Sequence, residues 1–382
     1  MRDFETARGF GVYIHWPYCA RVCPYCDFNV YAAKLRRPDP LLEAICEDLR
    51  AWRNLTGPRL VDTIFFGGGT PSLLAGEHIA RVIECVRDLW GVKAEPEITL
   101  EANPDDFGRF QSFRDAGVTR LSLGVQSLND ESLAFLGRTH SARDAVNALD
   151  VASSHFSCVS LDLIYALPGQ TVKAWEAELS LALSLPVGHL SLYELTIEAG
   201  AAFARAVKRG DWTPPDEDLA ADLYEVTQLM CEDAGYPAYE ISNHARSPSD
   251  ASRHNRIYWE SGDWVGVGPG AHGRLTARGE RLAIETVENP VAYQKQVGSC
   301  GHGRSVLQSL SRLDQIRERI SMGLRMTEGL KIEDLDTLGF QPSEPEMADL
   351  QELGFLDRRT DRIKLTLSGR LAADRISLLL SP

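Results

Sequence analysis

Short apolar runs alternate with amphipathic stretches through the first two thirds of the chain. The runs are rich in β-branched and aromatic residues, whereas the stretches between them repeat apolar residues at helical spacing, as Ile79, Val82 and Val86 do within residues 76–90. This alternation predicts a parallel sheet whose strands are joined by crossover helices. Six strands are expected, over residues 11–17, 63–68, 97–104, 120–127, 158–168 and 189–198. The expected fold class is therefore α/β, with six strand–helix units in a partial (β/α)6 barrel of the TIM type.

Residues suited to binding or catalysis gather where these strands end. They include residues 67–70, residues 101–104, Gln126 and Asp162, each near the carboxyl end of its predicted strand. Barrel-type α/β folds place their chemistry at that end of the strands. We therefore expect these residues to face one common site.

The alternation stops after Pro237, and a second kind of organisation begins. Residues 262–270 are rich in glycine, which predicts a loop. We therefore expect three parts, namely a barrel domain over residues 1–236, a connecting region over residues 237–304 and a C-terminal domain over residues 305–382.

The C-terminal domain has a pattern of its own. Helices are expected over residues 311–329 and 344–353, followed by a hairpin over residues 355–367 that turns near Thr360. A final helix is expected from Ser368. Helix, hairpin and helix in this order indicate a smaller, mainly helical, winged-helix-like region that packs against the barrel.

Composition and charge exclude several classes of function. The formal net charge of −14 repels a phosphate backbone, so nucleic acid is not an expected partner. The sequence has no run of eighteen apolar residues, which predicts no transmembrane segment, and residues 1–5 lack the apolar core of a secretory signal. The expected compartment is the cytoplasm.

Three of the eight cysteines, Cys19, Cys23 and Cys26, form a C-x3-C-x2-C array directly after the first predicted strand. Such clustering in a cytosolic chain indicates metal ligation. Three thiolates can hold three irons of a 4Fe–4S cubane and leave the fourth iron without a protein ligand. That iron can take the amino and carboxylate groups of S-adenosylmethionine (SAM), so that an electron from the cluster can enter the sulfonium.

Other uses of these cysteines fit the sequence less well. A structural zinc site needs four ligands, and no second pair of Cys or His follows at suitable spacing. A disulfide with one free thiol is unfavourable in the cytosol. The nearby His15 is expected to be a packed core histidine. The five scattered cysteines are expected to be small buried apolar residues, and they are Cys46, Cys85, Cys158, Cys231 and Cys300.

A triglycine turn over residues 67–69 ends the second predicted strand. Absent side chains allow backbone groups to approach a ligand closely. The turn lacks the Gly-Lys-Ser/Thr of a phosphate loop, which excludes that kind of nucleoside triphosphate site. Its position one strand after the cysteine array favours a role in holding a ligand.

Together these motifs resemble the radical SAM superfamily and, within it, the oxygen-independent coproporphyrinogen III oxidase-like family. The resemblance covers nearly the whole chain. It is carried by YIHWP (13–17), CARVCPYCDF (19–28), FGGGTPS (66–72), EANP (101–104), GVQS (124–127), LGR (136–138), DLIYALPGQ (162–170) and HNRIYW (254–259). The fold that this resemblance implies is the partial barrel of the radical SAM type.

The resemblance also implies a SAM site beside the cluster. Carried over position by position, Tyr13, Gly68 and Glu101 contact the cluster-bound SAM. Gly69 and Thr70 lie beside it.

A second set of residues matches positions that line a second SAM site in the oxidase. These are Tyr25, Gln126, Arg138 and Asp162. The residue types suit such a role, because a carboxylate accepts hydrogen bonds from ribose hydroxyls or an ammonium group, and an arginine can clamp a carboxylate through two donors.

Departures from the oxidase pattern favour another branch of the family. The oxidase carries a further cysteine two positions after the third ligand, where this chain has Phe28, and it has a longer N-terminal segment, whereas eighteen residues precede Cys19 here. The CPYCDF and HNxxYW motifs resemble instead the heme chaperone branch, often called HemW. That resemblance implies binding of heme and its transfer to acceptor heme proteins, such as membrane-bound respiratory enzymes, without coproporphyrinogen oxidase activity.

His254 is the candidate heme ligand within the HNxxYW motif. Imidazole is a common axial ligand, and the neighbouring Tyr258 and Trp259 can stack on a porphyrin. An equally favoured alternative is that the motif binds no heme and only organises the join to the C-terminal region. His244 and His272 are weaker candidates.

Two enzymatic alternatives share the same motifs. In the oxidase, reductive cleavage of SAM gives a 5′-deoxyadenosyl radical that abstracts hydrogen and drives decarboxylation of two propionates to vinyl groups. A related radical methyltransferase uses a second SAM as its methyl donor. The C-terminal domain carries no residue assigned to catalysis, and docking of an acceptor protein is a further hypothesis for it.

Overall fold

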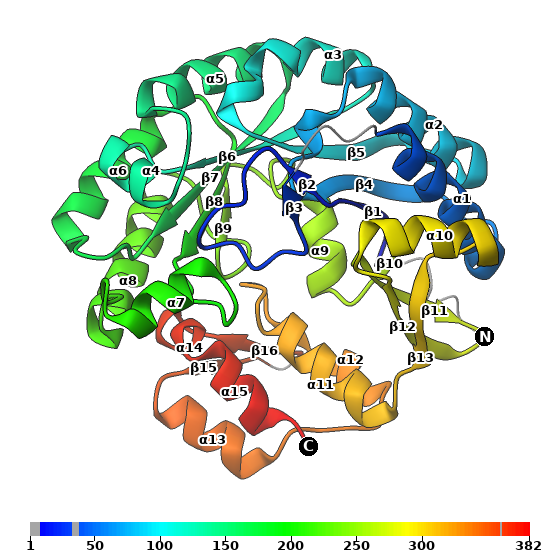
Figure 1. The fold of residues 1–382 in the computed structure, drawn as a ribbon. Helices are drawn as coiled ribbons and strands as arrows, with labels where there is room; N and C mark the ends of the chain where they lie inside the picture. Colours follow the sequence, from blue (N-terminus) through cyan, green and yellow to red (C-terminus); the bar gives the residue numbers. More distant parts are fainter. Residues whose placement is uncertain (1–7, 33–37, 360) are drawn as a thin grey trace.

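The computed structural model describes residues 8–32, 38–359 and 361–382. Residues 1–5 and Thr360, which entered the predictions above, lie outside that part. The chain folds into a curved sheet with helices on its outer side and a smaller, mainly helical region beside it (Figure 1).

All six predicted strands are present as neighbouring parallel strands. They are β1 (Phe10–Trp16), β4 (Val61–Gly68), β5 (Val92–Ala102), β6 (Arg120–Gln126), β7 (Cys158–Tyr165) and β8 (His189–Glu194). Their order in the sheet follows their order in the chain. The prediction of an α/β fold built as a partial barrel is therefore confirmed.

Helices between the strands cover the outer face of the sheet (Figure 1). They are α1 (Asp39–Thr56), α2 (Gly76–Trp90), α3 (Phe110–Asp115), α5 (Ala142–His155), α6 (Val172–Ser184) and α8 (Glu217–Asp233). Shorter elements flank the carboxyl ends of the strands, namely the 3-10 helices η2 (Pro71–Leu73) and η3 (Pro104–Arg109) and the helices α4 (Asp130–Phe135) and α7 (Ala202–Arg209).

Helix α2 illustrates why the amphipathic stretches fold as predicted. Ile79, Val82 and Val86 are fully buried, so the apolar stripe faces the sheet. Burying each such side chain stabilises the fold by roughly 1.5–3 kcal/mol. The helix ends at Trp90, and the following Gly91, with its positive φ of 74°, turns the chain toward β5.

The prediction of a loop over residues 262–270 was wrong. The segment contains strand β10 (Asp263–Val267), which pairs in parallel with β1. Glycine is present because strands approach closely here, and a Cβ on Gly266 would lie 2.0 Å from the carbonyl oxygen of His272. The sheet then continues through β11 (His272–Ala277), β12 (Glu280–Thr286), α10 (Pro290–Cys300) and β13 (Arg304–Ser309). The connecting region thus extends the barrel sheet, and the three predicted domain boundaries stay predictions.

Among the described residues the sheet is open, running from β13 at one edge to β9 (Asn243–Ala245) at the other. Helix α9 (Arg253–Trp259) packs against β1 and β4 from the inner side. A Cβ on Gly11 of β1 would lie 3.0 Å from Cε1 of His254, so glycine leaves room for this helix. The HNxxYW motif therefore lies inside the curve of the sheet.

The C-terminal region combines helices with a small three-stranded sheet. Its elements are α11 (Arg312–Gly323), β14 (Leu330–Lys331), α12 (Ile332–Asp336), α13 (Glu344–Glu352), β15 (Leu356–Arg358), β16 (Arg362–Leu365), α14 (Leu367–Leu371) and α15 (Ala373–Leu380). The helix predicted over residues 311–329 is shorter than expected. It ends where a Cβ on Gly323 would meet Leu330, and Gly329 with φ of +82° turns the chain into β14.

Candidate functional site

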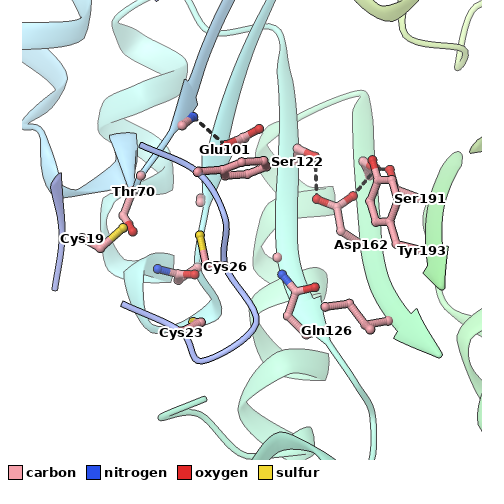
Figure 2. Close-up of a pocket in the computed structure, with 18 of the residues that line it drawn as sticks. Cys19, Cys23, Cys26, Thr70, Glu101, Ser122, Gln126, Asp162, Ser191 and Tyr193 are labelled. Carbon is pink, nitrogen blue, oxygen red and sulfur yellow. Dashed lines mark hydrogen bonds between the residues drawn. The ribbon is translucent and has the colours of Figure 1, made fainter. Parts of the chain in front are cut away.

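The thirteen residues that the sequence predicted for the site all line one cavity of about 740 Å³ inside the partial barrel. They are Tyr13, Cys19, Cys23, Tyr25, Cys26, Gly68, Gly69, Thr70, Glu101, Gln126, Arg138, Asp162 and His254. Figure 2 shows the cysteine loop on one side of Glu101, with Asp162 on the other. The fold therefore brings these residues together, while their individual roles stay predictions.

The three cysteines of the array lie on the segment between β1 and α1, which contains the short paired strands β2 (Tyr18–Cys19) and β3 (Tyr31–Ala32). A turn forms within the array, where the Cys26 N–H donates to the carbonyl of Cys23 at 3.2 Å. Arg138 reaches the same loop and donates from Nη1 to Sγ of Cys23 at 3.4 Å. All three thiols are free.

This set of thiols fits a 4Fe–4S cubane. A cubane spreads its thiolates over three different irons, and within the described residues no three Cys, His, Asp or Glu side chains converge as they do on a single ion. Burial raises the pKa of Cys19 and raises the pKa of Cys26 to about 11, so metal binding at these thiols displaces protons. The guanidinium of Arg138 places positive charge beside Cys23, which complements a thiolate.

The five remaining cysteines lie outside the cavity. Cys46 and Cys231 are buried as predicted, and Cys85 and Cys158 are partly exposed. The prediction was wrong for Cys300, which is exposed at the last residue of α10.

The triglycine turn brings bare backbone to the cavity wall. Gly68 has φ of +101°, and a Cβ there would lie 2.5 Å from the ring of His15, which is buried as predicted. A Cβ on Gly69 would lie 2.7 Å from the carbonyl oxygen of Tyr18. The N–H of Gly68 donates to Oε2 of Glu101 at 3.2 Å (Figure 2). Close packing therefore requires glycine at both positions, and the turn holds the Glu101 carboxyl in place.

Glu101 is a carboxyl group enclosed by protein. Burial raises its pKa to about 8, the negative charge of Asp162 adds to this effect, and the hydrogen bond from Gly68 opposes it. Glu101 is therefore largely protonated at neutral pH when no cation lies beside it. An ammonium or sulfonium cation at the wall would favour the carboxylate form.

Asp162 and Gln126 lie on neighbouring strands, Asp162 in the middle of β7 and Gln126 at the end of β6. Asp162 accepts hydrogen bonds from the hydroxyls of Ser122 and Ser160, each at 2.7 Å. Gln126 has a φ of +74°, which is uncommon for a residue with a side chain, and the register of β6 against β7 shifts between Gly124 and Gln126. This local distortion accompanies an amide that lines the cavity (Figure 2).

Arg138 connects the cysteine loop to the strand ends. In addition to Cys23, its guanidinium donates from Nη2 to Oδ1 of Asn103 at 2.5 Å and to the carbonyl of Gly124 at 2.8 Å. Tyr25 lies on the same loop and packs near the ring of Phe203, with 6.4 Å between ring centroids. Both side chains therefore line the cavity on the side of the cysteine loop.

Sequence reasoning missed a second layer of polar residues that lines the cavity more deeply. These are Arg120, Ser122, Ser160, His189 and Ser191. The signal was present, because R-L-S-L from residue 120, S-L-D-L from residue 160 and H-L-S-L from residue 189 alternate polar residues with leucine. In a strand covered on both faces, polar residues at every second position mark the face that lines an internal site.

Helix α9 places His254 at the deep end of the cavity, where it is only 1% exposed. Its Nδ1 lies 2.6 Å from Oγ1 of Thr63, and its Nε2 lies 2.7 Å from the hydroxyl of Tyr258. The ring stacks on Phe65 with 5.1 Å between centroids. Burial lowers the pKa of His254 to about 3, so the imidazole is neutral.

The two other candidate histidines lie outside the cavity. His244 is buried, with Nδ1 at 3.2 Å from the carbonyl oxygen of Tyr236. His272 is on β11, and its side chain is 61% exposed.

The fold and the cysteine-lined cavity together define a radical SAM protein. The profile of the Radical SAM superfamily matches residues 13–182, and that of the HemN C-terminal domain matches residues 310–372. The chain is 37% identical to the heme chaperone HemW of Mycobacterium tuberculosis, with 96% of this chain and 93% of that protein aligned. Within the superfamily, the chain therefore belongs to the coproporphyrinogen III oxidase-like family, in its HemW branch.

A second relative supports this placement, and a solved structure supports the fold. The chain is 38% identical to the mitochondrial radical S-adenosyl methionine domain-containing protein 1 of Bos taurus, over 97% of this chain and 86% of that protein. Among solved structures, the coproporphyrinogen III oxidase HemN of Escherichia coli superposes with a TM-score of 0.81, covering 98% of this chain and 90% of that chain at 22% identity. The second likeness concerns the fold alone.

Proposed function

We propose that this protein is a heme chaperone, which binds heme, holds a 4Fe–4S cluster with SAM, and transfers heme to acceptor proteins. The bacterial relative aligned over nearly the whole chain is named a heme chaperone. The observation that carries the proposal is that the cysteine array, polar residues such as Glu101 and Asp162, and Phe28 all line one cavity. Phe28 is 59% exposed and stands where the oxidase has its additional cysteine.

Cys19, Cys23 and Cys26 are the proposed cluster ligands. When bound, the cluster supplies an electron for reductive cleavage of SAM. Replacing all three cysteines with Ala should abolish the iron–sulfur absorption of anaerobically reconstituted protein. The Cys300→Ala variant is the matched control, since this exposed thiol lies outside the cavity. Full absorption in the triple variant would refute the assignment.

The proposed SAM contacts follow from the chemistry of the residues that line the cavity beside the triglycine turn. Gly68 and Gly69 expose backbone to a ligand, with Thr70 beside them, and Glu101 can accept a hydrogen bond from an ammonium or a hydroxyl group. Tyr13 lines the same wall, with its hydroxyl 3.1 Å from Nδ1 of His15. Four further residues are proposed for a second SAM or part of another ligand, and they are Tyr25, Gln126, Arg138 and Asp162.

His254 stays a candidate heme ligand, and its surroundings define a test. Nε2 of His254 is hydrogen-bonded to the hydroxyl of Tyr258. Ligation of the heme iron by Nε2 therefore requires this hydrogen bond to break. If His254 ligates heme, His254→Ala should change the heme absorption spectrum while Tyr258→Phe preserves it. If the motif only holds α9 against β4, both variants should keep the spectrum and lose stability.

The proposed partners are heme and acceptor heme proteins, among them membrane-bound respiratory enzymes, with the cytoplasm as the proposed compartment. In the part of the chain that the structure describes, no helix has the length and apolarity needed to cross a membrane. The net charge of −14 supports the proposal that nucleic acid is not a partner.

The function is tested by anaerobic incubation of reconstituted protein with reductant, SAM and either heme or coproporphyrinogen III. Stable heme absorbance on the protein, transfer to an apo-acceptor and no protoporphyrinogen by mass spectrometry are the expected results. The second candidate function is the oxidase, which the fold shared with HemN favours. Decarboxylation coupled to release of 5′-deoxyadenosine would establish that alternative and overturn the chaperone proposal.

A further inference from the structure

The deep end of the cavity contains a buried guanidinium that forms no close ion pair with a carboxylate of the described residues. Arg120 is 3% exposed and lines the cavity from β6. Its Nη1 donates to the carbonyl of Asp250 and to Sγ of Cys158, each at 2.7 Å. Its Nη2 is buried and has no hydrogen-bond partner among the described residues.

The hydroxyl of Thr99, next to Arg120, is also buried without a hydrogen-bond partner among the described residues. Thr99 of β5 is the register partner of Arg120, so the two side chains point to the same side of the sheet. Thr99 is 1% exposed and lines the cavity, and its Oγ1 also has no partner within the described part of the chain. Two buried donors on adjacent strands are therefore available to one ligand.

The acidic groups nearby are Glu97, Asp162 and Asp250, and they already serve other partners. Asp250 accepts the hydroxyl of Ser247 at 2.6 Å. Both carboxylate oxygens of Glu97 accept backbone N–H groups, from His254 at 2.9 Å and from Arg253 at 3.0 Å. Asp162 accepts the hydroxyls of Ser122 and Ser160, and Arg120 acts on it only through space, lowering its otherwise raised pKa.

His189 is not a counter-ion for Arg120 either, because an imidazole is neutral or positively charged. It lies in the same layer, and its two ring nitrogens contact Ser160 at 2.7 Å and the Tyr239 hydroxyl at 2.9 Å. Burial, with the charge of Arg120 in addition, lowers its pKa well below the ordinary value, so His189 is neutral.

A buried charge without a partner is costly, and a protein that keeps one gains by binding the opposite charge. A carboxylate suits this place, because it accepts from a guanidinium and from a hydroxyl at once. We propose that Arg120 and Thr99 form a carboxylate-binding subsite at the deep end of the cavity. The proposal rests on the heme chaperone function in one respect, because it assigns a propionate of heme as the bound carboxylate. A small free carboxylate has the same chemistry, and the experiment separates the two sources.

The first arm measures heme and its dimethyl ester, in which both propionates are masked, by absorbance titration on the full-length protein without SAM. Wild type should bind heme at least about tenfold more tightly than the ester, as one charge-assisted hydrogen bond of about 1.5 kcal/mol implies. Arg120→Gln should bind both with the affinity that wild type has for the ester. Arg253→Gln, which removes the same charge outside the cavity, should behave as wild type. A preference for heme that persists in Arg120→Gln overturns the propionate assignment.

Thr99→Val keeps Arg120 and the shape of the Thr99 side chain but removes the hydroxyl. It therefore tests the subsite if Arg120→Gln does not fold. It should reduce the preference for heme by roughly two- to tenfold, the value of one neutral hydrogen bond. An undiminished preference in a folded Thr99→Val contradicts the subsite.

The second arm does not depend on heme. The unfolding midpoint of each variant is measured as sodium acetate replaces sodium chloride at constant ionic strength, with acetamide as the neutral control. Saturable stabilisation by acetate in wild type and Arg253→Gln, but not in Arg120→Gln, supports the subsite even if heme fails to bind and the proposed function falls. Equal responses to acetate and acetamide in wild type overturn the subsite.

Discussion

At the scale of single residues, burial controls the charge of the cavity wall. Desolvation raises the pKa of both Glu101 and Asp162, and each carboxyl is held by donors from neighbouring strands. The φ of +74° at Gln126 also costs conformational free energy, and strained backbone of this kind is common at binding sites. The wall is therefore shaped for a ligand more than for the stability of the ligand-free protein.

Replacing Glu101 with Gln should stabilise the ligand-free protein at pH 8 and leave its stability unchanged near pH 4.5. Burial raises the folded-state pKa of Glu101 to about 8 from 4.5, so the stability linked to its proton is present below pH 4.5 and lost as the pH rises through 8. Glutamine does not ionise and avoids this loss, which amounts to a few kcal/mol at most. Urea unfolding between pH 4.5 and 9 measures the difference. The exposed Glu77→Gln variant is the control, and a difference that does not depend on pH would contradict the prediction.

At the scale of elements, the sequence predicts the strands better than what lies between them. Six strands were predicted correctly because buried parallel strands are short apolar runs. β10 was missed because glycine at residue 266 indicates a turn in sequence but serves close strand packing in the fold. The placement of α9 could not be predicted, since the carboxylate that accepts its first N–H groups, Glu97, is 156 residues away from Arg253.

Replacing Glu97 with Ala should release the start of α9. The substitution leaves the N–H groups of Arg253 and His254 without an acceptor in a buried place, at a cost of about 1–3 kcal/mol for each. Glu97→Gln keeps one acceptor oxygen and should lose less. Hydrogen exchange at these two amides and urea unfolding measure the effect. Unchanged amide protection in Glu97→Ala would show that α9 is held by packing on β4 alone.

At the scale of the whole molecule, the barrel and the C-terminal region have separate apolar cores that meet at residues 238–241. Ile241 packs against the C-terminal core, Glu240 forms a backbone bridge with Met326, and the N–H of Thr327 donates to the carbonyl of Tyr239. The packing expected from the sequence is therefore observed, whereas docking of an acceptor stays a hypothesis. The sequence gives no sign of the two backbone contacts at this junction, because they join groups that any residue carries.

Side-chain hydrogen bonds and one contact between two hydroxyl groups connect this junction to the cavity. Glu240 accepts from the amide of Asn243, whose Oδ1 accepts from Ser191 at 2.9 Å. Ser191 lies 3.2 Å from the hydroxyl of Ser160, which donates to Asp162 at 2.7 Å. The position of Asp162 therefore depends on a chain of contacts that begins where the C-terminal region packs.

Replacing Asn243 with Leu should break that chain in its middle. Ser191 and Glu240 then each lose a buried partner, which should lower stability by about 1–3 kcal/mol and weaken binding of a ligand held by Asp162. Denaturant unfolding and calorimetric titration of SAM into reconstituted protein measure the two effects. The control is Arg370→Gln, which removes a 2.9 Å contact between α14 and Gln228 of the barrel without touching the chain. If SAM affinity falls in Asn243→Leu but not in Arg370→Gln, the C-terminal region supports the site through this network. Equal affinities would mean that Asp162 is positioned by Ser122 and its own strand, independently of the junction.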